Sequence, residues 1–195
     1  RDVLGSRGLG DVYKRQIHAG SGLDQVTWMD VRVGDWVATP RHGKPVEINA
    51  LWYNALCTMD MLQARFGDND DSYRQLASLV KASFNKRFWN ENTGCLYDVV
   101  DEDDDTIRPN QIYAVSLPFT MPDMEREKAI VDTVMDKLYV GCGLRSLDPD
   151  HKDYHPIYIG SLSKRDHAYH QGTAWGFLLG GFISAYVKVL SLIHI

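Results

Sequence analysis

The feature that most constrains the fold is a run of apolar residues spaced three and four positions apart. Its members are Ile48, Leu51, Trp52, Ala55, Met59 and Leu62. This spacing places the apolar side chains on one face of an α-helix, so we expect a helix that starts at Glu47 and buries that face. Gly67 and the polar residues that follow it end the helix.

A second and a third helix are predicted further along the chain. Ser72 is the expected N-cap of the second helix, whose inner face holds Leu76, Leu79, Val80, Ser83 and Phe84. Pro109 opens a short third helix, because proline fits the first turn, and Pro118 stops it after Leu117.

Two more helices complete the predicted set. Asp123 caps a helix that runs to about Leu138, and the inward-facing residues are Ile130, Val131, Val134 and Leu138. The last helix runs from about Gln171 to Leu190. It is rich in glycine and aromatic residues, so we expect it to pack closely against its neighbours.

The segments between these helices carry different signals. Phe88 and Trp89 lead into an Asn-rich turn with Gly94, and the sequence LYDVV follows as a short strand, which predicts a hairpin. The acidic run 101–105 is expected to be a solvated loop, with a calcium site as the alternative, although the EF-hand spacing and its glycine are missing. The stretch 151–175 is aromatic and is expected to be irregular.

About five helices joined as antiparallel pairs, with little strand, predict an all-α fold. Some of the connecting loops are long, polar and aromatic, whereas a plain helical bundle has shorter loops. We therefore expect helical hairpins that form part of an α/α toroid, with a small β-hairpin insertion.

Composition narrows the class of function. The chain has 195 residues, is 44% hydrophobic and carries a net charge of −5 without a basic patch, which argues against nucleic acid as a partner. We expect no membrane span and see no signal peptide. Cys57, Cys95 and Cys142 fit neither a disulfide framework nor a zinc pattern, so we expect buried, reduced thiols in a cytoplasmic protein.

The two ends differ from the rest of the sequence. Residues 1–16 show no helical period and three closely spaced glycines, and residues 191–195 interrupt the last helix without a stop signal. Both resemble translated adaptor sequence, so we expect a non-native leader at 1–16 and a non-native tail at 191–195. The domain itself is then expected to be a partial one that spans 17–190.

Carboxylates and indole rings are concentrated in residues 26–56. Asp30 lies two positions from Trp28, Trp36 follows Asp35, and Arg41 and Glu47 come shortly before the first helix. Carbohydrate sites use such a combination, because sugar C–H faces stack on rings while hydroxyls bond to charged groups. An ordinary loop-to-helix junction has the same composition, so this segment leaves both interpretations open.

Five motifs in order resemble one family. They are TWMD, TPRHGKPVEINALWYNAL, IRPNQIYAVSLP, GLRSLDP and YHPIYIG…RDHAYHQGTAW, and together they cover about residues 22–190. The series is similar to the glucosidase domain of glycogen debranching enzymes, the amylo-α-1,6-glucosidase family. The resemblance implies an (α/α)6 toroid that hydrolyses the α-1,6-linked glucose at a branch point of glycogen-type α-glucans, with inversion and without a cofactor.

The resemblance also implies an acid. Asp30 matches the general acid of the family, and partial burial beside Trp28 would help it to keep its proton. Inverting glycosidases need a second carboxylate. The family's base lies in a segment that resembles SEIFDG, which this sequence lacks, so we expect the fragment itself to be inactive. Within the sequence the alternative bases are Asp35, Glu47, Asp98 and Asp166.

The remaining site residues are assigned to substrate binding. Stacking is expected from Trp36 and Trp175, whereas Trp52 fits the core better. Arg41 holds sugar hydroxyls or completes a charged turn, and Glu47 binds hydroxyls or supports the site. The full set is Trp28, Trp36, Arg41, Glu47, Asn110, Arg145, His170, Gln171 and Trp175.

Three other interpretations stay open. A metal could be bound by His151, His155, His167 and His170, but their spacing does not match a metal motif, so we assign none. The chain could instead be a non-catalytic helical module that binds a carbohydrate or a protein. Another toroid hydrolase, of the trehalase or glucoamylase kind, would share the chemistry but not this order of motifs.

Overall fold

The computed structural model of the protein describes residues 15–67 and 70–193. Its helices are α1 (Val46–Phe66), α2 (Ser72–Arg87), the 3-10 helix η1 (Pro109–Ile112), α3 (Tyr113–Ser116), α4 (Met124–Lys137), α5 (Leu162–Tyr169), the 3-10 helix η2 (Gly176–Leu178) and α6 (Leu179–Ile193). The helices predicted from Glu47, Ser72, Pro109 and Asp123 are confirmed. The N-cap of α2 is Asp71 rather than the predicted Ser72, which is the first helical residue, whereas Asp123 accepts a hydrogen bond from the Arg126 backbone N–H as a helix cap. None of the described helices is long and apolar enough to cross a membrane.

The described strands form four short antiparallel pairs. They are β1 (Arg32–Val33) with β2 (Trp36–Val37), β3 (Lys44–Pro45) with β6 (Val99–Val100), β4 (Trp89–Asn90) with β5 (Cys95–Leu96), and β7 (Leu144–Arg145) with β8 (Ala174–Trp175). The β4–β5 pair is the predicted hairpin. The single strand expected from LYDVV is divided: Leu96 belongs to β5, whereas Val99 and Val100 form β6 and pair with β3, which precedes α1 in the sequence.

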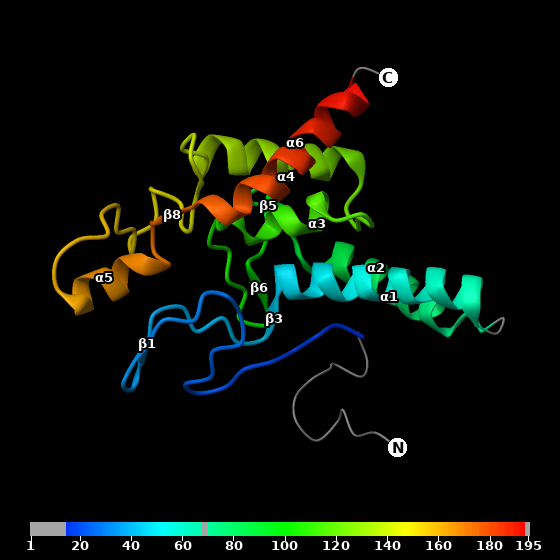
Figure 1. Cartoon of the computed structure of the whole chain (residues 1–195), viewed down its shortest axis with the longest axis horizontal. Coiled ribbons are helices and arrows are strands. Elements are labelled where there is room, and N and C mark those ends of the chain that lie inside the picture. Colours follow the sequence, from blue (N-terminus) through cyan, green and yellow to red (C-terminus); the bar gives the residue numbers. More distant parts are fainter. Residues whose placement is uncertain (1–14, 68–69, 194–195) are drawn as a thin grey trace.

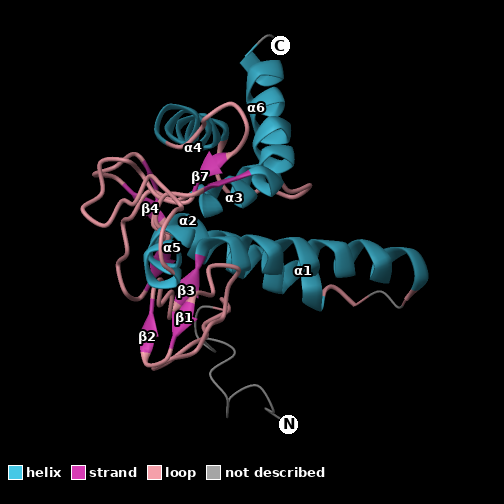
Figure 2. Ribbon diagram, turned by 60° about the vertical axis from the view of Figure 1, so that its left-hand side comes forward, coloured by secondary structure: helices cyan, strands magenta, loops and turns pink. Residues whose placement is uncertain are grey.

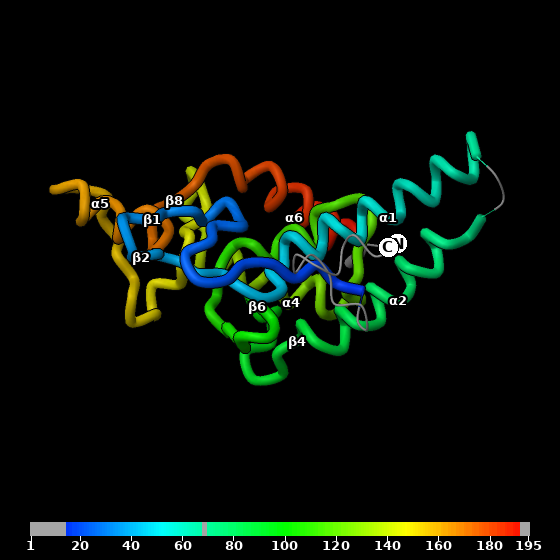
Figure 3. Tube along the Cα trace, turned by 90° about the horizontal axis from the view of Figure 1, so that it is seen from below, coloured from blue at the N-terminus to red at the C-terminus, as the bar shows by residue number. Residues whose placement is uncertain are grey.

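The helices pack in two groups around η1 and α3. α2 runs back along α1, and both α1 and α6 contact α3, while α4 packs on α6 (Figure 1). The strands and connecting loops gather near the start of α1 (Figure 2). Seen from below, α1 and α2 extend to one end of the molecule, whereas β1, β2, β8 and α5 lie at the other (Figure 3). The segments that hold β1, β2, β8 and α5 therefore lie together at one end of the molecule.

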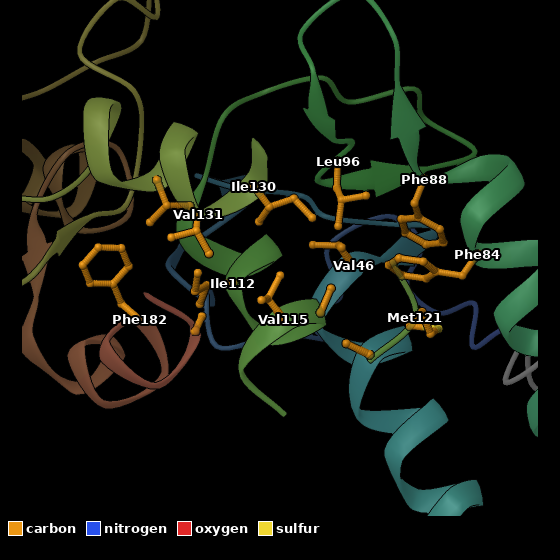
Figure 4. Packing of buried hydrophobic residues seen from close by; sticks show 14 of the residues in the cluster. Val46, Phe84, Phe88, Leu96, Ile112, Val115, Met121, Ile130, Val131 and Phe182 are labelled. Carbon is orange, nitrogen blue, oxygen red and sulfur yellow. The ribbon is translucent and has the colours of Figure 1, made fainter. Parts of the chain in front are cut away.

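One apolar core joins the two helical groups. Val46 and Phe84 come from the α1–α2 side, Val115 from α3, and Ile130 and Phe182 from α4 and α6 (Figure 4). All five side chains are buried. The Phe84 ring stacks on Phe88 with 4.3 Å between centroids. This core holds the start of α1 in place, and with it the loops that lie beside that end of the helix.

The predicted inner face of α1 is wrong over much of its length. Leu51, Met59 and Leu62 are more than 40% exposed, while the buried positions, Val46, Glu47, Asn49, Ala50 and Leu56, lie in the first half of the helix. The helix thus buries the polar side chains of Glu47 and Asn49, while part of its predicted apolar face is exposed. Leu79 of α2, also predicted to face inward, is exposed as well.

The segment before the last helix also differs from the prediction. Residues 162–169, expected to be irregular, form α5, and Ser161 caps it by accepting from the Lys164 backbone N–H. The last helix starts at Leu179 rather than Gln171, because Ala174 and Trp175 pair with β7 and η2 follows. α6 continues through the first three residues of the predicted tail, to Ile193.

One further prediction lies largely outside the described residues, and two others need correction. Most of the predicted leader 1–16, and residues 194–195 of the tail, lie outside the described residues. The acidic run is not simply solvated, because Asp101 pairs with Lys44 and Arg87. The thiols are free, and burial raises the pKa of Cys95, but Cys142 is exposed rather than buried.

The core predicts a large difference between two substitutions in one helix. Phe84→Ala removes a fully buried ring and should lower the free energy of unfolding by about 3–5 kcal/mol. Leu79→Ala, at a position that is 56% exposed, is the matched control and should change it by less than about 0.5 kcal/mol. Urea denaturation followed by circular dichroism measures both, and equal losses would contradict this description of the core.

Candidate functional site

The short β3–β6 ladder brings two distant segments together beneath the site. The Val46 backbone N–H donates to the Asp98 carbonyl at 3.0 Å, so Asp98 lies beside the first turn of α1. Gly43 precedes this ladder with φ +106°, and a Cβ there would lie 2.7 Å from the Val100 carbonyl oxygen. Only glycine fits such a close approach at positive φ. The loop that carries Arg41 is therefore held close to β6.

Arg41 occupies the centre of a buried ion network. Its Nη2 donates to Glu47 Oε2 at 2.7 Å, and its Nη1 contacts the other oxygen of the same carboxylate. Its Nε donates to Asp98 Oδ2 at 2.6 Å and its Nη2 to Asp98 Oδ1 at 3.0 Å. All three side chains are at most 4% exposed. Although burial alone would lower the pKa of Arg41, the Asp98 and Glu47 carboxylates raise it, so the guanidinium is charged.

From Asp98 the network continues to an indole ring. Asn110, at the start of η1, donates to Asp98 Oδ1 at 2.8 Å, and its own side-chain oxygen accepts from Trp28 Nε1 at 2.7 Å. Asn110 is completely buried. A buried amide bonded on both sides fixes the Trp28 ring relative to β6. The order of contacts is therefore Arg41, Asp98, Asn110 and Trp28.

Arg108 joins the loops on the other side of the network. It donates to the Ser146 carbonyl at 3.0 Å, to the His170 carbonyl at 2.8 Å and to Gln171 Oε1 at 2.9 Å. Gln171 in turn donates to the Ala38 carbonyl at 3.3 Å. Burial lowers the pKa of the Arg108 guanidinium, and Asp98, 3.7 Å from its Nε, opposes this effect. Sequence reasoning missed Arg108, whose signal is a charged residue between Ile107 and Pro109.

The fixed indole belongs to an aromatic cluster. Trp28 meets His170 and Trp175 edge to face, with centroids 5.1 Å and 5.6 Å apart, and His170 stacks on Trp175 at 5.5 Å. Phe177 and Tyr169 pack on the outer sides of Trp28 and Trp175. These residues come from the loop before β1, from the end of α5, and from β8 and η2. Edge-to-face and offset contacts are favourable geometries for aromatic rings.

Asp30 lies beside this cluster and faces solvent. Its side chain is 64% exposed, and its Oδ1 is 3.5 Å from His170 Nε2. The expected partial burial of Asp30 is therefore wrong, because the preceding Met29 is the residue that turns inward. The structure thus connects Asp30 to three predicted site residues: its carboxyl group contacts His170, and Trp28 and Trp175 pack on the His170 ring. An exposed carboxyl group beside fixed rings can exchange a proton with a ligand that stacks on them.

Two clefts open next to these loops. A cleft of about 390 Å³ is lined by the segment 38–41, by Arg108 and Gln171, and by the charged groups of Glu102, Asp104 and 151–153. A smaller cleft of about 240 Å³ is lined by Trp36, Ala38, Asp153, His155, His167 and Gln171. Gln171 lines both. Neither cleft is lined by Asp30, so its carboxyl group is reached from open surface.

The other predicted site residues lie in different surroundings. Trp36 is 37% exposed and stacks on His167 with 4.2 Å between centroids. Arg145 is half-buried on β7, opposite Ala174, and lines neither cleft. Arg41, Glu47 and Asn110 are buried and belong to one hydrogen-bonded network. This is the arrangement of groups that support a site. Direct contact of these residues with a sugar stays a prediction.

A metal site finds no support in the side-chain arrangement. Within residues 15–67 and 70–193, no three His, Cys, Asp or Glu side chains gather so that they could hold a metal ion. His155 and His167 do approach each other, with ring centroids 6.2 Å apart, beside Trp36. Their contacts are with aromatic rings and with backbone carbonyls.

A mostly helical fold with a carboxyl group and aromatic rings at one loop end defines a helical glycoside hydrolase domain, or part of one. The chain belongs to the amylo-alpha-1,6-glucosidase family, which matches residues 11–193. It is similar to the glycogen debranching enzyme of Saccharomyces cerevisiae (strain ATCC 204508 / S288c), with 28% identity over 218 residues, 87% of this chain and 14% of that protein. The chain therefore spans about a seventh of the length of this relative.

A solved structure supports the architecture. The GH63 mannosylglycerate hydrolase from Thermus thermophilus, in complex with Tris, matches with a TM-score of 0.52 and 14% identity, over 76% of this chain and 36% of its own. At this identity the likeness shows the fold alone. The chain resembles part of an (α/α)6 glycosidase and adds small two-stranded sheets.

The ion network predicts a large loss of stability from one substitution. Arg41→Met leaves Glu47 and Asp98 buried without their cation, so it should lower the free energy of unfolding by about 3–5 kcal/mol. Lys128→Met makes the corresponding change in the exposed Lys128–Asp132 pair of α4 and should cost less than about 1 kcal/mol. Urea denaturation measures both. A loss at Arg41 as small as that at Lys128 would mean that the network does not hold these segments.

Proposed function

We propose that the protein acts in the hydrolysis of α-1,6-glucosidic branch linkages of glycogen-type α-glucans, with inversion and with Asp30 as the general acid. The observation that carries the proposal is the exposed Asp30 carboxyl group in contact with His170, whose ring packs in one cluster with Trp28 and Trp175. Membership of the amylo-alpha-1,6-glucosidase family supports the reaction class. The name of the yeast relative, glycogen debranching enzyme, supports glycogen as a ligand. We further propose limit dextrin as a ligand and the cytoplasm as the place of action.

The acid step needs a proton at an exposed position. Asp30 donates it to the glycosidic oxygen as the bond to the anomeric carbon breaks, and the released chain leaves with a new hydroxyl group. The exposed fraction of Asp30, 64%, lets a branched polymer approach. Trp28 and Trp175 are half-buried, and the parts of their rings that the cluster leaves uncovered offer apolar surface to a sugar.

The general base is proposed to come from outside these 195 residues. Glu47 and Asp98 are the buried carboxylates near the site, and Arg41 binds both, so neither is placed to activate a water molecule. Asp35 lies in the exposed turn between β1 and β2. An inverting glycosidase with an acid but no base binds a glucan without hydrolysing it.

A non-catalytic carbohydrate-binding module is the second candidate. Trp36 favours it, because His167 supports the exposed indole from one side and the small cleft lies beside both rings. Such a module would bind limit dextrin through this cleft and would not need Asp30. The same assay separates the two candidates.

We expect glucose release from a glucosyl-branched limit dextrin only from a form of the chain that is extended until it includes a second carboxylate loop. In that form Asp30→Asn should lower kcat by roughly 100- to 10,000-fold, the range that a lost general acid produces. Asp24→Asn, a matched change at another exposed carboxylate of the same loop region, should retain activity.

Glucose release by the 195 residues alone would overturn the assignment of an external base. No release from any form, with folding confirmed by circular dichroism and limit dextrin still bound, would favour the binding module. Loss of binding on Trp36→Ala would then locate the bound glucan at the smaller cleft.

A further inference from the structure

His170 is a polar side chain held in an apolar setting. It ends α5, its side chain is 1% exposed, and its backbone carbonyl accepts from Arg108 at 2.8 Å. The ring stacks on Trp175, and it meets Trp28 and Tyr169 in T-shaped contacts with centroids 5.1 Å and 4.7 Å away. Backbone and ring are therefore both fixed, so the direction of the ring nitrogens is fixed too.

Only one of the two ring nitrogens faces a polar group. Nε2 is 3.5 Å from Asp30 Oδ1, at the outer limit of a hydrogen bond. Both ring nitrogens are buried and neither makes a hydrogen bond to a residue in the described part of the chain, so the Asp30 carboxyl group is the polar group within reach of Nε2. Bonds between catalytic groups are often long before a substrate binds and shorten in the complex. The contact with Asp30 is thus the polar interaction open to the His170 side chain, whose other contacts are with aromatic rings.

The charges around the ring keep it neutral. The pKa of His170 is lowered from 6.5 to about 4. Burial lowers it most, the Asp30 carboxylate raises it, and the charges of Arg108 and Arg41 lower it. At neutral pH the imidazole therefore carries one proton and no charge. A cation at this distance would favour the ionised carboxylate and remove the proton that a general acid must give, whereas a neutral ring does not.

We propose that His170 is a positioning residue for Asp30: its neutral imidazole donates from Nε2 to Oδ1 and leaves the transferable proton on Oδ2, the other oxygen of this exposed carboxyl group. This inference rests on the proposed role of Asp30 as the acid. The opposite tautomer would accept the proton of Asp30 and hold it away from the substrate. The buried ring thus selects both the orientation of the carboxyl group and the oxygen that carries the proton.

The contact can be tested on the intact chain without any activity. Nitrogen-15 NMR of labelled histidine should show His170 neutral at pH 7 with its proton on Nε2, and titrating only at acidic pH, near 4. Asp30→Asn should move the titration to still lower pH, because it removes the charge that raises the pKa. Asp24→Asn should leave it unchanged. A proton on Nδ1 at pH 7, or the same His170 resonances in Asp30→Asn as in the wild type, would overturn the proposal.

The functional consequence is tested in the form that releases glucose. His170→Phe keeps a buried ring without a donor and should lower kcat by roughly 10- to 100-fold with little change in KM, because the acid is misoriented rather than the substrate lost. His170→Gln restores a neutral N–H donor and should recover most of kcat. Equal losses in both variants, or a loss that appears in KM, would indicate a packing or substrate-contact role.

The two experiments separate this inference from the proposed function. Glucose release without the NMR coupling between His170 and Asp30 overturns the inference alone. Absence of glucose release in every form overturns the proposed function, and the positioning role with it.

Discussion

The rest of the structure depends on one buried cation. Arg41 must meet two carboxylates that come from segments far apart in sequence, the first turn of α1 and the residue before β6. Removing three charges from water is costly unless each finds its partner with good geometry. Only the arrangement in which the 38–41 loop, α1 and β6 converge satisfies all three, so the network selects that register over others with equal apolar burial.

The Arg41 network is connected to the site by a series of contacts between neighbouring side chains. Asp98 binds Asn110, Asn110 binds Trp28, and Trp28 lies against His170, which faces Asp30. Arg108 ties the backbone at His170 to the loops on the opposite side. An exposed carboxyl group on an irregular loop would otherwise be mobile. Here its surroundings are held by a network in which Asp98 and Asn110 are buried and hydrogen-bonded.

Local signals in the sequence predicted the local structure. The Asp123 cap, the Pro109 start and the β4–β5 turn each depend on neighbouring residues, and each is confirmed. The family motifs also led to Trp28, Asp30 and His170, which the fold brings together. What the sequence could not reveal was pairing over long separations. The β3–β6 and β7–β8 ladders, the role of Arg108 and the exposure of Asp30 follow from contacts that no local pattern encodes.

These ladders also affect the order of folding. Lys44 pairs with Val100 and Arg145 with Ala174, so the closing loops are long, whereas α1 and α2 meet through a short connection. Loop-closure entropy makes contacts between distant residues slower to form than local ones. The helical hairpin is thus expected to assemble early and the aromatic cluster late. A ligand that binds the cluster would then recognise only chains that have completed folding.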